Sequence, residues 1–378
     1  MLTGGGARAA YQVGLLLGIA RHFHNLKFQV ITGVSAGAIN ASFLAANEGT
    51  LIEKAEMLAD IWCELSCENI FRFDLRSMLP FRSALASLFP RHHWTWSRPR
   101  GLVDTTPLRR MLRRVLNARD RGPIDGIKRN LRSGDLKAVA LTTLDYSTGQ
   151  TVRWVQGRDV DVFEGPNRRS VAADLTIDHV MASASLPFVF PAVHIGNQWH
   201  GDGGIRLVAP LSAAVHLGAA RVLAMSTGYQ RTPEEAQHPV VLGYPPAAQI
   251  LSQLVNAVFL DVIDEDVARM ERMNEMITKM PPGERNGFRP IDLCVLRPTT
   301  DLGVLAAEYE KYLPRKIKFI TRALGAKETE SPDFVSLLMF EPRYMRKLIE
   351  IGAHDIESRI DELRSFFSTP ARSRMTAV

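Results

Sequence analysis

A serine on a glycine-flanked turn has the setting of a catalytic group. Ser35 lies in the stretch "GVSAG" (33–37), which fits the pattern G-x-S-x-G. The apolar run 28–33 before it is typical of a strand, and the alanine-rich run 36–47 after it is typical of a helix. On a sharp turn of this kind the hydroxyl stands clear of the sheet, and the glycines leave room for substrate. The pattern predicts a nucleophile; the alternative is an ordinary strand-to-helix turn in which Ser35 only caps the helix.

A serine hydroxyl is a poor nucleophile unless a base activates it. Asp202 is the best candidate, because it stands alone among glycines in "GDGG" (201–204), where no neighbouring side chain would keep its carboxylate from the serine. A Gly/Asp β-turn is the alternative interpretation of this stretch. Histidine is the other possible base, but no histidine fits the late position of the α/β-hydrolase order Ser, acid, His. The histidines His194, His200, His216 and His354 are second choices for the base. His354 is late in the chain, but it lies in a charged helical tail.

Three glycines, Gly4, Gly5 and Gly6, precede a helical pattern. Such a loop presents free N–H groups to an anion. The stretch "GGGARA" also fits the dinucleotide fingerprint, but that site needs an acid about 20 residues on, and 25–32 contains neither Asp nor Glu. A Walker loop is excluded because no Gly-Lys-Ser/Thr follows. With a serine nucleophile on the next strand, the amides predict an oxyanion hole, in which Arg8 adds charge or fixes the loop.

The ordered motifs "GGGARAAYQVG", "GVSAGAINA" and "DGG" resemble those of the patatin-like phospholipase family, bacterial branch. The stretch "ASASLPFVFP" (182–191) also resembles the family, and the resemblance covers about 1–226. It implies a catalytic dyad of Ser35 and Asp202 without histidine, with Asp202 accepting the proton. It further implies that the N–H groups of Gly5 and Gly6 hold the oxyanion while Gly4 shapes the loop. The glycines that support the other motifs are Gly33, Gly37, Gly203 and Gly204. Ala9 departs from the family, which often has glycine there.

The elements that must position these residues alternate along the front half of the chain. Short β-rich runs alternate with helical patterns, which predicts a mainly parallel sheet with helices on both faces. With the resemblance, this gives a three-layer α/β/α patatin-like fold followed by a C-terminal helical extension. The expected strands are 28–33, 137–144, 150–156 and 221–226, with a hairpin at 193–199. The expected helices are 9–23, 36–47, 51–65 and one long amphipathic helix over 249–277.

The chain is expected to divide near residue 226. Residues 1–226 form the patatin-like core, and 227–378 form a mostly helical extension with one strand near 291–297. Within the core, an insertion at about 71–114 holds ten arginines and two aspartates. Its aromatic residues are Phe71, Phe73, Phe81, Phe89, Trp94 and Trp96. This mixture suits the headgroup region of a membrane; the alternative is a solvated insertion whose aromatic rings pack on the main domain.

Composition limits the class of protein. The 378 residues are 46% hydrophobic and 23% charged, which is typical of a globular chain. No apolar run reaches the roughly 20 residues that span a bilayer, and the start lacks a signal-peptide pattern. Three cysteines predict neither a disulfide framework nor a zinc site, and they suit a reducing compartment. The net charge of +6 is mild. We expect a cytoplasmic protein, peripheral at membranes, with no metal, other cofactor or nucleic-acid partner.

These residues predict a lipid acyl hydrolase, a phospholipase A or carboxylic ester hydrolase that forms an acyl-enzyme intermediate. Its substrate is expected to be phospholipid or another fatty-acyl ester. The alternative is a membrane-associated binding or scaffolding protein with a vestigial dyad, served by the insertion and by the basic tail stretch 311–324. An NAD-binding oxidoreductase is a more distant third. No oligomeric state is indicated.

Overall fold

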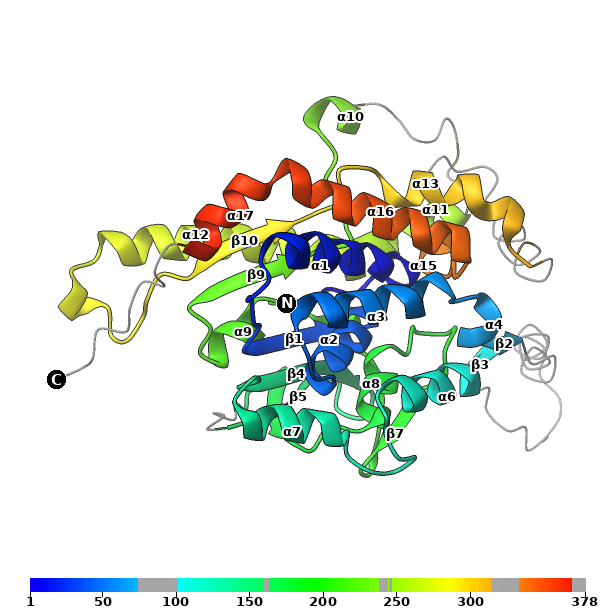
Figure 1. Cartoon of the computed structure of the whole chain (residues 1–378), viewed down its shortest axis with the longest axis horizontal. Coiled ribbons are helices and arrows are strands. Elements are labelled where there is room, and N and C mark those ends of the chain that lie inside the picture. Colours follow the sequence, from blue (N-terminus) through cyan, green and yellow to red (C-terminus); the bar gives the residue numbers. More distant parts are fainter. Residues whose placement is uncertain are drawn as a thin grey trace.

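The computed structural model describes residues 1–73, 101–158, 163–237, 244, 247–314, 318 and 333–368. Figure 1 shows a central sheet with helices on either side. Six strands form one part of the sheet, two form a parallel pair, and the bridge residue Leu2 joins the parts by pairing with Gly33 and Met225. The strands of the first part are β1 (Val30–Val34), β4 (Ala138–Asp145), β5 (Thr151–Gly157), β6 (Arg168–Ala172), β7 (Val193–Ile195) and β8 (Gln198–Asp202); the pair is β9 (Arg221–Met225) and β10 (Asp292–Leu296).

The sheet is mixed in strand direction. β1 runs parallel to β4, β5 to β6, and β9 to β10. β4 and β5 are antiparallel because a short turn, 146–150, joins them, and β7 and β8 are antiparallel around a turn at 196–197. A few turn residues can connect only antiparallel neighbours, whereas parallel strands need a longer crossover. The two hairpins therefore add antiparallel strands to a sheet that we predicted to be mainly parallel.

Helices cover both faces of the sheet, as the alternation along β4 shows. Val139 and Leu141 belong to the main hydrophobic core. Ala138 and Ala140 belong to a smaller cluster with Leu217, which follows helix α9 (Ser212–His216). Successive side chains of a strand point to opposite faces, so both faces of β4 are covered. The three-layer α/β/α fold class is confirmed.

Most predicted elements are present to within a few residues. The helices of the front half are α1 (Ala10–His22), α2 (Ala36–Ala46), α3 (Leu51–Cys63), α4 (Cys67–Ile70), α6 (Thr106–Val115), α7 (Asp125–Ser133) and α8 (Ile177–Ser183). Those that follow β9 are α10 (Pro233–Gln237), α11 (Ala247–Val255), α12 (Val262–Lys279), α13 (Leu302–Tyr309), α15 (Asp333–Leu337), α16 (Pro342–Ser358) and α17 (Ile360–Ser368). Short 3₁₀ segments lie at Gly6–Ala9, which begins at the last glycine of the loop, and at Gly203–Arg206, which directly follows Asp202.

The single long helix predicted over 249–277 is wrong. A π-helical segment, Asn256–Leu260, and a turn at Asp261 separate α11 from α12. Phe259 in this segment lies against Gly204, where an added Cβ would be 2.5 Å from the ring. Single π-helical turns often occur at functional sites, and this one lies beside the Asp202 motif.

The C-terminal part of the chain packs on the first helix. Figure 1 shows α16 lying along α1. A Cβ added at Gly14 would be 2.1 Å from the carbonyl oxygen of Ile349, so the two helix backbones are in direct contact. The buried Tyr11 hydroxyl also donates a hydrogen bond to Asp355, at 2.8 Å. Side chains from both parts therefore share the main core, and the proposed division near residue 226 stays a prediction.

Most of the predicted insertion lies outside the described residues. At its two ends, β2 (Arg72–Phe73) pairs antiparallel with β3 (Val103–Asp104), and α6 follows. Phe71 is buried, with its ring centroid 5.9 Å from that of Phe190. Residues 74–100, which include Phe81, Phe89, Trp94 and Trp96, are not described, and neither is most of the basic stretch 311–324. The membrane role of both segments stays a prediction.

Candidate active site

The C-terminal ends of β1 and β8 meet along one edge of β4, and this arrangement forms the site. β5 occupies the other edge of β4 over 138–144. β1 pairs as far as Val34 with Thr142, and β8 approaches from the opposite direction and pairs Asp202 with Thr143. Ser35 follows Val34 directly, so the ends of the two strands carry Ser35 and Asp202 to adjacent positions.

Ser35 and Asp202 are joined by a short hydrogen bond. The Ser35 hydroxyl donates to Oδ2 of Asp202 at 2.6 Å. The other carboxylate oxygen, Oδ1, accepts the N–H of Gly204 at 2.8 Å. Asp202 is 0% exposed and Ser35 is 6% exposed. Both oxygens of the buried carboxylate are therefore held by hydrogen bonds, one of them from the serine.

Burial makes Asp202 a stronger base than an ordinary aspartate. Removal from water disfavours its charged form and raises its pKa to about 7, although the hydrogen bonds from Ser35 and Gly204 act in the opposite direction. A carboxylate with a pKa near neutrality can accept a proton in one step and return it in the next. The site therefore has the electrostatic character of a general base.

Ser35 is held in a backbone conformation that few side chains adopt. Its φ is 55° and its ψ is −133°, outside the common regions for residues with a Cβ. Its N–H donates to the hydroxyl of Ser183 at 3.1 Å, and that hydroxyl donates to the carbonyl of Thr142 at 2.7 Å. Such strain persists only where the surroundings enforce it, and it is common at active sites.

The stretch 182–191 supports both members of the pair. Ser183 anchors the Ser35 backbone, and the carbonyl of Ser185 accepts the N–H of Asp202 at 3.1 Å. The sequence places this stretch in the family resemblance but predicts no role for it. The small polar residues at alternate positions were the available signal.

The glycine loop faces the same pocket as Ser35. Gly5 and Gly6 line this pocket, with φ angles of 144° and 54° that favour glycine. Within the described part of the chain, neither N–H donates a hydrogen bond to a protein acceptor. The carbonyl of Gly4 accepts the Thr227 hydroxyl at 2.5 Å. The loop therefore offers two unused donors beside the serine hydroxyl.

Arg8 is buried behind the loop. Its side chain is 1% exposed and does not line the pocket. Its guanidinium forms an ion pair with Asp333, and its Nε donates to the Ser336 hydroxyl at 2.6 Å. Of the two roles expected for Arg8, these contacts favour fixing the loop.

The motif glycines are placed where a side chain would collide. A Cβ added at any of them would lie 2.2–3.0 Å from a neighbouring atom. These glycines are Gly4, Gly5, Gly6, Gly33, Gly37, Gly203 and Gly204. At Gly4 that neighbour is Ser35 itself, so the absence of a side chain lets the loop approach the serine.

The histidines that were second choices lie elsewhere. His200 is buried with its Nδ1 3.2 Å from the Thr143 hydroxyl, and His194 packs edge-on against Trp199. His216 contacts the carbonyl of Ser212, and His354 is exposed. Among the described residues, no histidine forms a hydrogen bond with Ser35 or Asp202.

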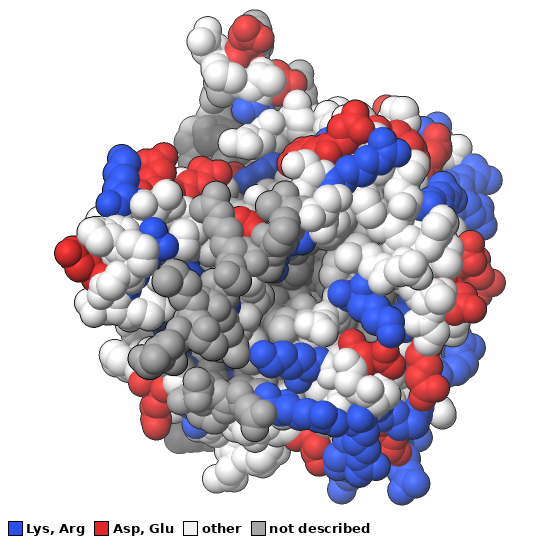
Figure 2. All heavy atoms as spheres, turned by 60° about the vertical axis from the view of Figure 1, so that its left-hand side comes forward, with Lys and Arg blue, Asp and Glu red and all other residues white. Residues whose placement is uncertain are grey.

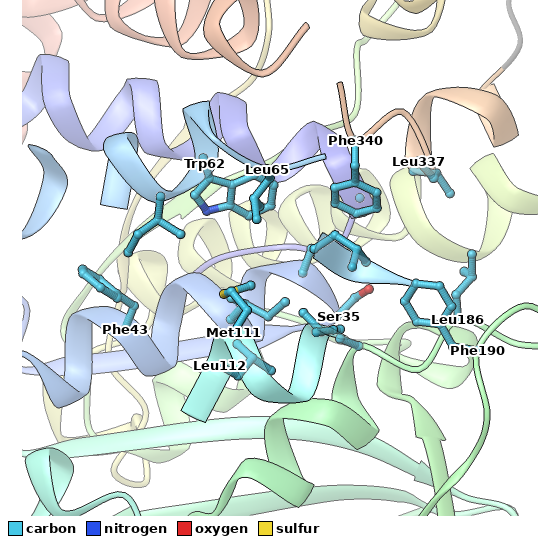
Figure 3. A pocket seen from close by; sticks show the side chains of 18 of the residues that line it. Ser35, Phe43, Trp62, Leu65, Met111, Leu112, Leu186, Phe190, Leu337 and Phe340 are labelled. Atoms are coloured by element: carbon cyan, nitrogen blue, oxygen red, sulfur yellow. The ribbon is translucent and has the colours of Figure 1, made fainter. Parts of the chain in front are cut away.

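An apolar pocket opens beside Ser35. Figure 3 shows Ser35 between Phe43, Trp62 and Met111 on one side and Leu186 and Phe190 on the other. The pocket encloses about 830 Å³ of empty space, part of it open to solvent. The almost wholly apolar lining of the pocket suits an alkyl chain.

The described residues contain no group of three or more His, Cys, Asp or Glu side chains that could hold a metal ion. The cysteines Cys63, Cys67 and Cys294 are free thiols.

The N-terminal part of the chain matches a known protein family. A family model described as patatin-like phospholipase matches residues 1–215. Among solved structures, the crystal structure of VipD from Legionella pneumophila is similar at 11% sequence identity, covering 99% of this chain and 80% of that chain with a TM-score of 0.32. No curated protein matches the sequence.

Proposed function

The chain belongs to the patatin-like phospholipase family, which implies lipid acyl hydrolase activity, and we propose that Ser35 is the nucleophile and Asp202 the base. The observation that carries the proposal is the 2.6 Å hydrogen bond between the Ser35 hydroxyl and the buried carboxylate. The raised pKa of Asp202, to about 7, supports the role of base. The substrate class is a fatty-acyl ester.

The first half of the reaction transfers the acyl group to the serine. As Oγ of Ser35 attacks the ester carbonyl carbon, its proton passes to Asp202. The carbonyl oxygen becomes an oxyanion, and the unused N–H groups of Gly5 and Gly6 are the donors proposed to hold it. When the tetrahedral intermediate collapses, the ester C–O bond breaks and the leaving alcohol takes the proton from Asp202.

The second half releases the acid. A water molecule attacks the acyl-enzyme and gives a proton to Asp202, and the oxyanion forms again at the same N–H groups. The bond between the acyl carbon and Oγ then breaks, and Ser35 recovers its proton from Asp202. One carboxylate serves both halves, which requires a pKa close to the working pH.

The proposed oxyanion loop needs support because a run of glycines has many accessible conformations. Arg8 follows the loop by two residues and is held by Asp333 and Ser336. We assign Arg8 the role of fixing the loop. Asp333 and Ser336 then act as positioning residues, since their side chains hold the side chain of Arg8.

A lipid substrate also requires contact with a lipid surface. None of the helices in the described ranges has the length and apolarity to cross a bilayer. Phe188 is 86% exposed, with a φ of 64°, and lies between Leu186 and Phe190, which line the pocket. Acidic and basic side chains are interspersed over most of the face in Figure 2, so charge does not mark a lipid-binding surface on this face. Our proposal of membrane contact is therefore based on the exposed ring of Phe188.

The direct test is hydrolysis of a short p-nitrophenyl ester by the wild type and by Ser35→Ala and Asp202→Ala. We expect both variants to lose activity while circular dichroism and the unfolding transition show a retained fold. Ser133→Ala, at the end of α7, is the matched control and should keep full activity. Retained activity in Ser35→Ala would refute the mechanism. A folded wild type that binds vesicles but hydrolyses no ester would instead support a binding protein with a vestigial dyad.

A further inference from the structure

We infer that the apolar pocket binds the acyl chain of the substrate and favours chains of about ten carbons. Phe43 lies at the far end of the pocket and limits the length of the chain. The inference rests on the proposed function, because the alkyl chain in the pocket belongs to the acyl group attached to Ser35. It adds a substrate preference and the residues that set it.

One face of α2 forms a side of the pocket, and the spacing of the residues on this face gives the length of the pocket. Ser35, Ile39 and Phe43 all line it, at intervals of four residues, which places them one above another on the helix. With a rise of 1.5 Å per residue, Phe43 lies about 12 Å beyond Ser35 along the helix axis. Figure 3 shows Phe43 at the opposite end of the pocket from Leu186.

The length of the pocket determines how many carbons of an extended alkyl chain it can hold. With C–C bonds of about 1.5 Å and bond angles near 111°, each carbon advances the chain by about 1.25 Å. The 12 Å between Ser35 and Phe43 therefore accommodates about ten carbons, counted from the ester carbonyl.

Buried side chains form the far end of the pocket. Phe43 and Leu58 are each 1% exposed and Leu112 is 0% exposed, whereas Leu186 and Leu338 near Ser35 are half-buried. Trp62 is fixed in the pocket wall because its indole N–H donates to Asn40 at 2.9 Å. A longer chain must displace this close-packed wall or leave carbons in water, and both are unfavourable.

Chain-length profiles of the wild type test the inference. We propose measuring kcat/KM for saturated p-nitrophenyl esters of about four to about sixteen carbons, all presented in the same detergent micelles. Each methylene buried should raise kcat/KM by up to about fourfold, so the profile should rise to about ten carbons and then level off or fall. A profile that climbs steadily to sixteen carbons would overturn the inference.

Two substitutions should move the optimum in opposite directions. Ile39→Phe places a ring about 6 Å from Ser35 along α2, so esters of eight to twelve carbons should lose about tenfold or more in kcat/KM while the four-carbon ester is still hydrolysed. Phe43→Leu opens the far end and keeps part of the packing, so the optimum should move to longer chains.

The controls are the same substitutions outside the pocket. Ile52→Phe on α3 and Phe23→Leu, whose ring packs on Phe367, should leave the profile unchanged. If both pocket variants hydrolyse esters with the wild-type profile, the inference fails and the proposed function stands. If the wild type hydrolyses no ester of any length, the proposed function itself fails.

Discussion

Arg8 forms a buried ion pair with Asp333, which lies 325 residues further along the chain. Asp333 also accepts a hydrogen bond at 2.7 Å from the side chain of Asn256, the first residue of the π-helical segment that brings Phe259 to the pocket. These contacts connect the glycine loop to residues outside the 1–215 that match the family model. We therefore propose that the C-terminal extension supports the glycine loop of the active site through Asp333.

The ion pair predicts a catalytic effect for a residue that does not line the pocket. Asp333→Asn leaves the buried Arg8 cation without its counter-charge, so the loop loses its fixed position. We expect kcat to fall about tenfold or more with little change in KM, because the oxyanion donors act mainly in the transition state.

Steady-state kinetics on a soluble ester, with the unfolding transition as a check, measures this effect. Asp333→Glu should restore part of kcat, since it keeps the charge. Glu357→Gln, which removes an exposed pair with His22, is the control and should have wild-type kcat. A folded Asp333→Asn protein with unchanged kcat would contradict the positioning role.

The pKa of Asp202 predicts the pH dependence of the reaction. Burial raises it to about 7, against the hydrogen bonds from Ser35 and Gly204, and only the deprotonated carboxylate can act as the base. We expect kcat/KM to fall about tenfold per pH unit below pH 7 and to level off above it. The measurement is a pH profile with a soluble ester from about pH 5 to about pH 9. A flat profile over this range would argue against Asp202 as the base.

The same pKa predicts that the site lowers the stability of the fold. Because the folded-state pKa of Asp202 is raised from 3.8 to about 7, its favourable contribution is present at acid pH and is lost as the pH rises through 7. Asp202→Asn should therefore raise the free energy of unfolding at pH 8, by up to about 4 kcal/mol, and should have little effect near pH 4.

Urea unfolding at the two pH values tests this prediction. Asp145 gives a matched control of opposite sign at the end of β4. Burial raises the pKa of Asp145, but the hydrogen bonds from Ser147 and Thr148, together with the nearby His200, outweigh it, so the net shift is downward. Asp145→Asn should thus lower stability at pH 8. Asp202→Asn that destabilises at pH 8 would contradict the account.

The local setting of the site could be predicted from the sequence, but the partners from distant segments could not. The turn at Ser35 has a local signature, because an apolar strand, two glycines and an alanine-rich helix are contiguous. The register that places Asp202 beside Thr143 depends on the order of strands, which only the resemblance suggested.

Asp333 and Phe259 had no signal in the sequence. Asp333 follows a polar stretch, and its pairing with Arg8 depends on how the extension folds back. The periodicity of 249–277 is helical throughout, so the pattern gave no sign that a π-helical segment brings Phe259 to Gly204. Packing of the extension, rather than local preference, determines both positions.

Phe188 predicts a difference between substrates in vesicles and substrates in solution. The exposed ring lies two residues from each of the pocket-lining Leu186 and Phe190, and it should enter the headgroup region of a membrane. Phe188→Ser should lower the hydrolysis of phospholipid in vesicles about tenfold and leave kcat/KM for a short soluble ester unchanged. Tyr244→Ser is the control, an exposed ring outside the stretch 186–190. Equal losses on both substrates would count against an anchoring role.

The central claim is that Asp202 activates Ser35, and a fluorophosphonate probe tests it most directly. The probe reacts with activated serines, and mass spectrometry of the digested protein identifies the modified residue. We predict one adduct, at Ser35, which forms about a hundredfold or more slowly in Asp202→Asn than in the wild type. An adduct at a different residue, or labelling of Ser35 at the same rate in Asp202→Asn, would contradict the account.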